Sequence, residues 1–319
     1  MNKAKRDQKI IGEKAFHEFY RQMTKTNDDH ELLIQSLKLK NVPCILINPL
    51  HQNKLKQLWH AHGLSMESIP WFAQAIKWPK EMSFPSQLPG YDQHWFYLLN
   101  PASLLPVIAL NIQPKEVVLD ACAAPGGKTL ALSWSTPVND ITIVANELSK
   151  QRYLQLKNNM IAYGLEKTEI ANLPAEIIGA KAGEVFDKIL LDAPCSSEKH
   201  VMQNPKVLQT WTPKRITKLV ERQLRLIKSL IKTLKVGGTL VYATCAVNMQ
   251  ENEGIVAKAL KNLGNTLELI DISYVPEIGS SGLSSDLTSA FNLGKVRRVL
   301  PHLQEGYDPM FVAAFKRLS

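Results

Sequence analysis

Apolar runs alternate with amphipathic segments from about Ile112 to the end of the chain. This rhythm predicts a mostly parallel β-sheet with helices on both faces, and hence an α/β fold. The first run, Glu116–Asp120, is nearly continuously apolar, which is typical of a strand buried on both sides. Further strands are expected at Ile141–Glu147, Glu169–Leu173 and Phe186–Asp192, and a fifth in the segment TLVYATC that ends at Cys245.

The segments between these runs have helical spacing. Helices are expected over Lys128–Ser133, over Ser149–Tyr163 before Gly164, and from Pro213 to about Lys235, where Gly237-Gly238 should stop the last one. Leu267–Ile272 and Met310–Lys316 are expected to complete the sheet as an antiparallel pair. In this arrangement the fourth and fifth strands would both neighbour the first.

The first 110 residues lack this rhythm. Helical stretches are expected at Asp29–Leu39 and Lys54–His62, a strand at Cys44–Asn48, and aromatic residues surround a proline-rich connection at Trp78–Pro89. We therefore expect a small α/β or helical domain over residues 1–90 and a catalytic domain over residues 91–319. The aromatic residues between positions 71 and 97 could stack on nucleic-acid bases, but packing between the domains is favoured.

Charge narrows the class of partner. The 319 residues carry a formal net charge of +9. This suits a polyanion, because each neutralised phosphate releases counterions, although a solvated basic surface is the alternative. No apolar run reaches the roughly 18 residues of a membrane helix. The N-terminal segment lacks the pattern of a secretory signal. A cytoplasmic protein without membrane contact is therefore expected.

The four cysteines, Cys44, Cys122, Cys195 and Cys245, are scattered without closely spaced pairs. Zinc sites need closely spaced ligands, and disulfide frameworks are typical of small secreted chains. No metal site is therefore expected, and the thiols should be reduced and available for chemistry.

The loop after the first strand has the sequence DACAAPGGK, from Asp120 to Lys128. Its small residues let the backbone approach a ligand, and the helix that follows favours negative charge at its start. It is neither a Walker loop nor a GxGxxG motif. Glu147, at the end of the second strand, is placed to bind ribose hydroxyls. Together they indicate a nucleoside cofactor without a pyrophosphate, such as S-adenosylmethionine.

A second group of chemical residues follows the fourth and fifth strands. Asp192-Ala-Pro-Cys195 should present its acid and its thiol to one cleft, with Cys245 at the adjacent strand end. A free cysteine is usually a small buried hydrophobe. However, two thiols and a carboxylate above a cofactor pocket are difficult to explain by packing alone.

DACAAPGGKT, LLDAPCSS and VYATCAVNMQENE resemble the three signature motifs of the Sun-type (Nop/Sun) RNA cytosine-C5 methyltransferases. The resemblance extends to Leu98–Leu110 and Val296–His302, and covers roughly residues 40–317. DAPCSSEKHVM lacks the glycine and arginine of the commonest bacterial pattern and is closer to the subgroup with mitochondrial rRNA and tRNA enzymes. The resemblance implies a class I (Rossmann-like) S-adenosylmethionine-dependent methyltransferase with a mostly parallel, seven-stranded sheet.

The resemblance also implies roles for individual residues. Cys245 would attack C6 of cytosine and form a covalent adduct, which makes C5 nucleophilic toward the methyl group. Cys195 would assist release of the product, and Asp192 would hold the N3/N4 edge of the base. Lys128 would help to place the base and the acid.

The family pattern also assigns the cofactor contacts. The loop residues that would hold the methionine moiety are Cys122, Ala123, Ala124, Pro125, Gly126, Gly127 and Lys128. Glu147 would bind the ribose, Asp192 also borders the cofactor, and Arg152 matches a family arginine nearby, with a plain exposed arginine as the alternative. Members usually have an adenine-binding aspartate where Pro174 falls here, which leaves Asn172, or Glu176, as a substitute. Asn100 also replaces a common acid.

The implied substrate is structured RNA, either rRNA or tRNA, with a cytosine that is unpaired or can leave its stack. The small N-terminal domain would contact this RNA, and the enzyme is expected to be a monomer. A catalytically silent RNA-binding or assembly factor and a DNA cytosine-C5 methyltransferase are the alternatives. Basic residues that could hold phosphates follow the PC motif: Lys199, His200, Lys206, Lys214 and Arg215.

Overall fold

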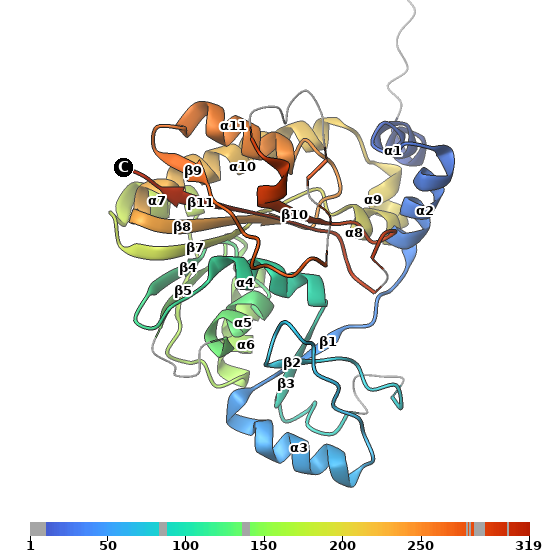
Figure 1. The fold of residues 1–319 in the computed structure, drawn as a ribbon, viewed down its shortest axis with the longest axis vertical. Coiled ribbons are helices and arrows are strands. Elements are labelled where there is room, and N and C mark those ends of the chain that lie inside the picture. Colours follow the sequence, from blue (N-terminus) through green and yellow to red (C-terminus); the bar gives the residue numbers. More distant parts are fainter. Residues whose placement is uncertain are drawn as a thin grey trace, which may run out of the picture.

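The computed structural model describes residues 11–82, 88–135, 141–278, 280, 282–283, 291–304 and 306–319. Within these residues the main sheet has the strand order β10-β11-β8-β7-β4-β5-β6, with β9 paired to β11 (Figure 1). Neighbours from β8 to β6 run parallel, whereas β11 is antiparallel to β8, β9 and β10. The strands are β4 (Val117–Asp120), β5 (Thr142–Asn146), β6 (Glu169–Ala171), β7 (Phe186–Asp192), β8 (Leu234–Thr244), β9 (Leu267–Leu269), β10 (Val296–Val299) and β11 (Met310–Arg317).

The α/β fold with a mostly parallel sheet is thus confirmed, but three details differ from expectation. The described sheet has an eighth strand, β10, which was missed because two arginines break its apolar pattern. β8 lies beside β7 and is not a neighbour of β4. Gly237 and Gly238 do not stop a helix but lie within β8, where Gly238 lets the strand pass Asp187 at an irregular register with β7.

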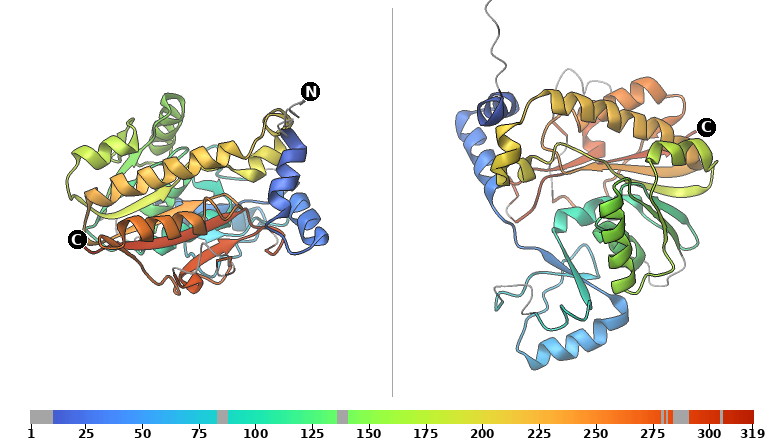
Figure 2. Two further views of the ribbon diagram at one scale, coloured as in Figure 1. Left: turned by 90° about the horizontal axis from the view of Figure 1, so that it is seen from above. Right: turned by 180° about the vertical axis from the view of Figure 1, so that it is seen from behind.

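The sheet buries side chains on both faces. On β7, Ile189 and Leu191 point into one core and Leu190 into the other, as the period of two in a strand requires. Helices α7, α10 and α11 cover the first face, and α4, α5 and α6 cover the second (Figures 1 and 2). These helices are α4 (Leu105–Leu110), α5 (Gly127–Trp134), α6 (Lys150–Ala162), α7 (Ala175–Lys181), α10 (Lys214–Leu230) and α11 (Glu253–Leu263).

Two short helices, α8 (Glu198–Gln203) and α9 (Pro205–Gln209), occupy the segment between β7 and α10, for which the sequence pattern predicts no element. They were missed because each is too short to show a hydrophobic period. Asn204 separates them, and its side chain accepts a hydrogen bond from Val207 N. The expected long helix also ends earlier, at Leu230, before a 3-10 turn over Ile231–Thr233.

The segment before the main sheet has two parts with different packing. Helices α1 (Gly12–Arg21) and α2 (Asn27–Lys38) share the hydrophobic core of α8–α10, with Phe16 5.2 Å from Trp211 between ring centroids. A separate three-stranded sheet has the order β2-β1-β3. Together with α3 (Gln52–Ala61) it forms the lower part of the molecule in Figure 1. Its strands are β1 (Cys44–Ile47), β2 (Ala75–Ile76) and β3 (Phe96–Leu99). The boundary near residue 90 stays a prediction.

The aromatic residues of this region serve packing in both parts. Trp78, Trp95 and Phe96 belong to the core of the small sheet, around the buried Trp59. Trp71 and Tyr97 pack instead against the core of the main sheet. The proline-rich connection at Trp78–Pro89 lies partly outside the described residues.

Both connections of the small sheet meet one loop of the main body, residues 306–308. Asn41, just before β1, donates to the Tyr307 carbonyl (2.8 Å) and to Asp308 Oδ1 (2.9 Å). Asn100, just after β3, accepts from Asp308 N (3.0 Å) through its side chain. Asp308 also forms an ion pair with Lys199 on α8. In the described parts of the chain, no helix is long and apolar enough to cross a membrane.

Candidate active site

The carboxyl ends of β4, β5, β7 and β8 bring the chemical residues together, as parallel strands in an open sheet do. The loop over residues 121–126 follows β4, Glu147 follows β5, Asp192 ends β7, and Cys245 directly follows β8. The loop after β4 opens directly into α5. All four connections therefore lie along one edge of the sheet.

The loop after β4 depends on its two glycines. Gly126 has φ +111°, and a Cβ there would lie 2.7 Å from Met160 Cε. A Cβ on Gly127 would lie 2.7 Å from Tyr97 Cε1. Only glycine fits both positions without displacing a neighbour, so the loop is held tightly between α6 and β3.

Asp120 lies beneath this loop and is fully buried. Its Oδ2 accepts a hydrogen bond from Thr129 Oγ1 at 2.7 Å, whereas its Oδ1 has no described partner. Burial raises the pKa of this carboxyl to about 7, against the opposing effect of the Thr129 hydrogen bond. The group supports the loop from below and titrates near neutrality.

Lys128 and Asp192 form an ion pair at the centre of the site. Lys128 Nζ lies 2.7 Å from Asp192 Oδ2, and the two side chains are 15% and 30% exposed. Burial works against the charge on Lys128, but Asp192 outweighs it and raises the pKa of the ammonium group. A cavity of about 150 Å³ lies against them, lined also by Tyr97, Ser103 and the loop residues 123–125 and 127.

The two thiols that follow β7 and β8 are in contact. Cys195 Sγ lies 3.2 Å from Cys245 Sγ, and Ser197 Oγ lies 3.3 Å from the same Cys245 sulfur. The hydrogen bond with Cys195 lowers the pKa of Cys245 against the opposing effect of burial, and Ser197 adds to this lowering. The same hydrogen bond, together with burial, raises the pKa of Cys195. Cys245 is thus the thiol more easily converted to thiolate.

Glu147 and its neighbours form the outer part of the edge. Glu147 is 4% exposed, and its Oε1 accepts a hydrogen bond from Ser149 N at 2.8 Å. Its Oε2 accepts no hydrogen bond among the described residues, but it lies 3.2 Å from Arg152 Nη1 in an ion pair. The buried carboxylate therefore keeps an acceptor available for a ligand hydroxyl.

Arg152 and Asn172 both brace this edge. Arg152 Nη2 donates to the Ala124 carbonyl and so ties α6 to the loop after β4. Asn172 Nδ2 donates to the carbonyls of Glu147 (2.6 Å) and Leu148 (3.0 Å). These bonds occupy the amide nitrogen of Asn172, so its expected contact with adenine stays a prediction for the oxygen alone.

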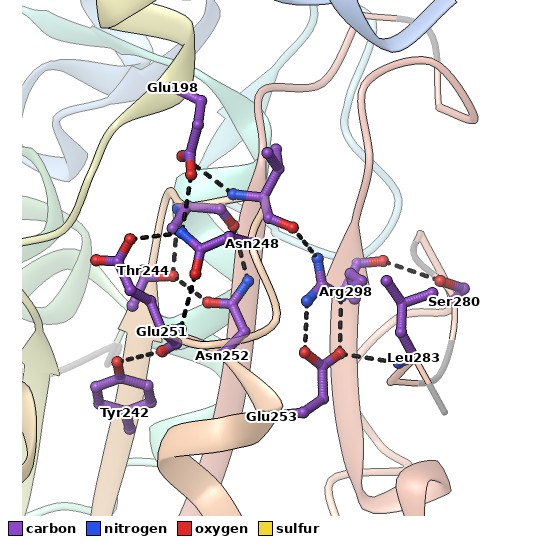
Figure 3. A network of polar contacts seen from close by, with 12 residues as sticks. Glu198, Tyr242, Thr244, Asn248, Glu251, Asn252, Glu253, Ser280, Leu283 and Arg298 are labelled. Atoms are coloured by element: carbon purple, nitrogen blue, oxygen red, sulfur yellow. Dashed lines mark hydrogen bonds and ion pairs between the residues drawn. The ribbon is translucent and has the colours of Figure 1, made fainter. Parts of the chain in front are cut away.

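Sequence reasoning missed several residues of the site. Ser197 has a left-handed backbone (φ +51°), unusual for a serine, and places its hydroxyl beside Cys245. Behind the thiols, a buried polar network contains Glu198, Asn248 and Glu251 (Figure 3). The polar run NMQENE in the sequence was the signal for it, because such a run is unusual directly after a buried strand.

Lys199, one of the basic residues expected to hold phosphates, forms an ion pair with Asp308 instead.

The sheet and its loops place the chain among the Rossmann-like methyltransferases. Residues 107–316, about two thirds of the chain, match the family model described as 16S rRNA methyltransferase RsmB/F. The chain therefore belongs to this family.

Named relatives agree with this assignment. The ribosomal RNA small subunit methyltransferase F of Serratia proteamaculans (strain 568) is 35% identical over 209 residues, which cover 64% of this chain and 43% of that protein. The protein of the same name from Shewanella amazonensis is 29% identical over 275 residues, 82% of this chain and 58% of the relative. The chain thus spans about half the length of the curated relatives it matches. The closeness to the subgroup with mitochondrial enzymes stays a prediction.

Solved structures show the same fold. NSun6 from Pyrococcus horikoshii, determined with SFG, superposes with a TM-score of 0.80 at 20% identity, covering 96% of this chain and 98% of that one. A methyltransferase homologue from the same organism gives a TM-score of 0.75 at 25% identity, with 94% and 98% covered. The likeness covers nearly the whole of this chain, including the small sheet.

Proposed function

We propose that this protein transfers a methyl group from S-adenosylmethionine to C5 of a cytosine in RNA. The observation that carries the proposal is the contact between two thiols beside the Lys128–Asp192 ion pair. A cytosine carbon at this position is too weak a nucleophile to be methylated unaided. A thiolate that adds to the ring removes that barrier, and the site holds a thiol with a lowered pKa.

Cys245 is the nucleophile in this proposal. Its sulfur forms a bond to C6, and the electron pair of the C5–C6 bond moves to C5. Asp192 holds the N3/N4 edge of the ring where charge develops, and the hydrogen bond from Lys128 orients the Asp192 carboxyl group. The cofactor, when bound, supplies an electrophilic methyl group that C5 can attack.

Release of the product requires two bonds to break. The C5 proton passes to a base, the C5–H electrons restore the ring double bond, and the S–C6 electrons return to the Cys245 sulfur. Cys195, 3.2 Å from that sulfur, assists this elimination. Its raised pKa keeps it protonated while Cys245 departs, which separates the roles of the two thiols.

The residues present fit the cofactor. The Glu147 carboxylate has an oxygen without a hydrogen bond at the end of β5, where ribose hydroxyls can donate to it. The loop over Cys122–Lys128 presents small residues and the start of α5 toward the same edge. Arg152 contributes by fixing the Ala124 carbonyl of this loop. Asn172 would contact the adenine only through its side-chain oxygen, which can accept a hydrogen bond from the adenine amino group.

Small-subunit ribosomal RNA is the proposed substrate, because the matched family and relatives carry that name. Attack on C6 requires the cytosine to leave its stack, so an unpaired or readily flipped nucleotide is expected. The net charge of +9 favours binding to the phosphate backbone. A cytoplasmic location and a monomeric state remain part of the proposal.

The test is transfer of labelled methyl from S-adenosylmethionine to small-subunit rRNA, tRNA and DNA, with Cys245→Ala and Cys195→Ala beside wild type. Wild type should label the rRNA, Cys245→Ala should label nothing, and Cys195→Ala should accumulate a covalent protein–RNA adduct. Full activity in Cys245→Ala would refute the proposed nucleophile. A wild type that binds RNA without labelling it would indicate a silent assembly factor, and labelling of DNA alone would indicate a DNA enzyme.

A further inference from the structure

Two glutamates are buried directly behind the thiols. Glu198, at the start of α8, and Glu251, just before α11, are both fully buried. Within the described residues, neither forms an ion pair with a lysine, an arginine or a histidine. Burying two carboxyl groups without a cation is costly, and the cost is offset only where hydrogen bonds replace water. What these hydrogen bonds hold in place therefore matters.

The hydrogen bonds run crosswise between two loops, the Cys195 loop (residues 193–197) and the Cys245 loop (residues 245–252). Glu251 belongs to the Cys245 loop but accepts from Ser196 N at 3.0 Å, the residue next to Cys195. Glu198 follows the Cys195 loop but accepts from Val247 N at 3.1 Å, two residues after Cys245. Each carboxyl group thus holds the backbone of the opposite loop.

Four side chains complete this crossed arrangement, and one of them, Tyr20 on α1, donates its hydroxyl to Glu198 Oε1. Asn248 Nδ2 lies 2.9 Å from Glu198 Oε1 and 2.5 Å from Glu251 Oε2, and so joins the two acids. Gln223 Nε2 on α10 donates to Glu251 Oε1 (2.8 Å) and to the Pro194 carbonyl (2.9 Å). Ser196 Oγ donates to Glu198 Oε1 at 2.7 Å. The loops are therefore fixed to each other and to α10.

We propose that Glu198 and Glu251 are positioning residues that lock the Cys195 loop against the Cys245 loop and so set the contact between the two thiols. Neither acid touches a sulfur atom, so they act through the backbone that carries Cys195 and Cys245. This inference deepens the proposed function, on which it relies for the roles of the thiols. Its test, however, can be read without methyl transfer.

Glutamine is the appropriate substitution because it keeps the size of the side chain. Glu251 accepts from Gln223 through Oε1 and from Asn248 through Oε2, and Ser196 N is shared between Oε1 (3.0 Å) and Oε2 (3.3 Å). An amide offers one acceptor and one donor, so Glu251→Gln loses the bond from Gln223 or the bond from Asn248, and in either case one of the two contacts with Ser196 N. Glu198→Gln faces the same conflict between Val247 N on Oε2 and the donors on Oε1.

The measurement is the rate at which a disulfide closes between Cys195 and Cys245 under diamide, followed by peptide mass mapping. The two thiols lose two protons and two electrons, an S–S bond forms, and the N=N bond of diamide is reduced to a hydrazine. Wild type should close rapidly, since its sulfur atoms are already 3.2 Å apart. Glu198→Gln and Glu251→Gln should close at least about tenfold more slowly, the effect of a 1.4 kcal/mol loss of alignment.

A matched control separates positioning from general stability. Asn48 is 1% exposed and donates to the Tyr163 carbonyl at 3.2 Å, far from both loops in the chain. Asn48→Ala should lower the unfolding midpoint and leave the rate of disulfide closure unchanged. In methyl transfer, the two glutamine variants should lower kcat and leave the KM for S-adenosylmethionine nearly unchanged, because in the described part of the chain neither acid is hydrogen-bonded to the loop over residues 121–127.

If both glutamine variants fold and form the disulfide at the wild-type rate, the proposal is overturned. It is also overturned if Asn48→Ala slows disulfide formation as much as the glutamine variants do. If neither glutamine variant folds, Ser196→Ala decides, because it removes one hydroxyl donor from Glu198 and leaves Ser196 N in place. It should fold and close measurably more slowly, and an unchanged rate would refute the proposal. If the wild-type protein methylates no RNA, but the glutamine variants still form the disulfide more slowly than wild type, the result counts against the proposed function and leaves the positioning role intact.

Discussion

A buried ion pair between β10 and α11 gives the sharpest stability prediction. Arg298 and Glu253 have side chains that are 1% and 0% exposed. Arg298 Nε donates to Glu253 Oε1 at 2.8 Å, Nη2 donates to Oε2, and Nη1 donates to the Val247 carbonyl at 2.7 Å (Figure 3). We predict that Arg298→Met strongly destabilises the protein, although methionine fills most of the same space.

The expected magnitude follows from what the substitution leaves behind. Glu253 stays fully buried with the Leu283 amide, at 2.8 Å, as its remaining described hydrogen-bond donor. The Val247 carbonyl also loses its arginine donor. Removing one partner of a buried ion pair costs about 3–5 kcal/mol, mainly because the other charge is left uncompensated. The double variant with Glu253→Gln removes that charge and keeps an acceptor for Leu283, so it should be more stable than Arg298→Met alone.

The assay is urea unfolding followed by circular dichroism, with the free energy of unfolding extrapolated to water. The m-value should be unchanged between variants, so that the shift in midpoint reports stability. A loss below about 1 kcal/mol in Arg298→Met would refute the reasoning, since that is the scale of an exposed pair. A double variant less stable than the single one would refute it as well.

Three further predictions concern other parts of the molecule. The raised pKa of Asp120, about 7, means that the folded state holds this proton more tightly than the unfolded state. The contribution of Asp120 to stability should therefore fall as the pH rises from 4 to 7, by about 4 kcal/mol, and Asp120→Asn should remove this part of the profile measured by thermal unfolding. Gly127→Ala, with its Cβ 2.7 Å from Tyr97, should cost about 1–3 kcal/mol in urea unfolding, and Gly63→Ala, which meets no atom within 4 Å, is the open-space control. Trp211→Ala should cost about 3–5 kcal/mol and speed hydrogen exchange in α1; unchanged exchange there would contradict the packing.

Much of the fold was predictable because buried parallel strands read as apolar runs. β4, β5 and β7 all fall within their expected segments, and β9 and β11 form the expected antiparallel pair. β10 was not predictable in this way, because Arg298 interrupts its pattern and finds its partner only on α11, 45 residues earlier. The pairing of Arg298 with a distant residue allows this strand to be buried, and the local sequence pattern does not reveal that pairing.

The candidate site was also only partly predictable from the sequence. Asp192, Cys195 and Cys245 could be placed at strand ends, and the resemblance distinguished the roles of the thiols. The contact at 3.2 Å and the opposite pKa shifts of the two thiols needed coordinates. The roles of Glu198 and Glu251 were not predicted, because a single buried polar residue produces no hydrophobic periodicity in the sequence. Their hydrogen-bond partners also lie about 50 residues away along the chain.

The small sheet is topologically an insertion, since the chain enters it from α2 and leaves it toward α4, both of which pack on the main body. Its entry and exit, at Asn41 and Asn100, hydrogen-bond to the same loop, residues 306–308. The two ends of the small sheet are therefore tied to a single loop, while Asn48 bonds the Tyr163 carbonyl and so joins the sheet to the end of α6 as well. Asp308 is also paired with Lys199, one residue beyond Glu198, so the small sheet and the helix that follows the Cys195 loop share one anchor.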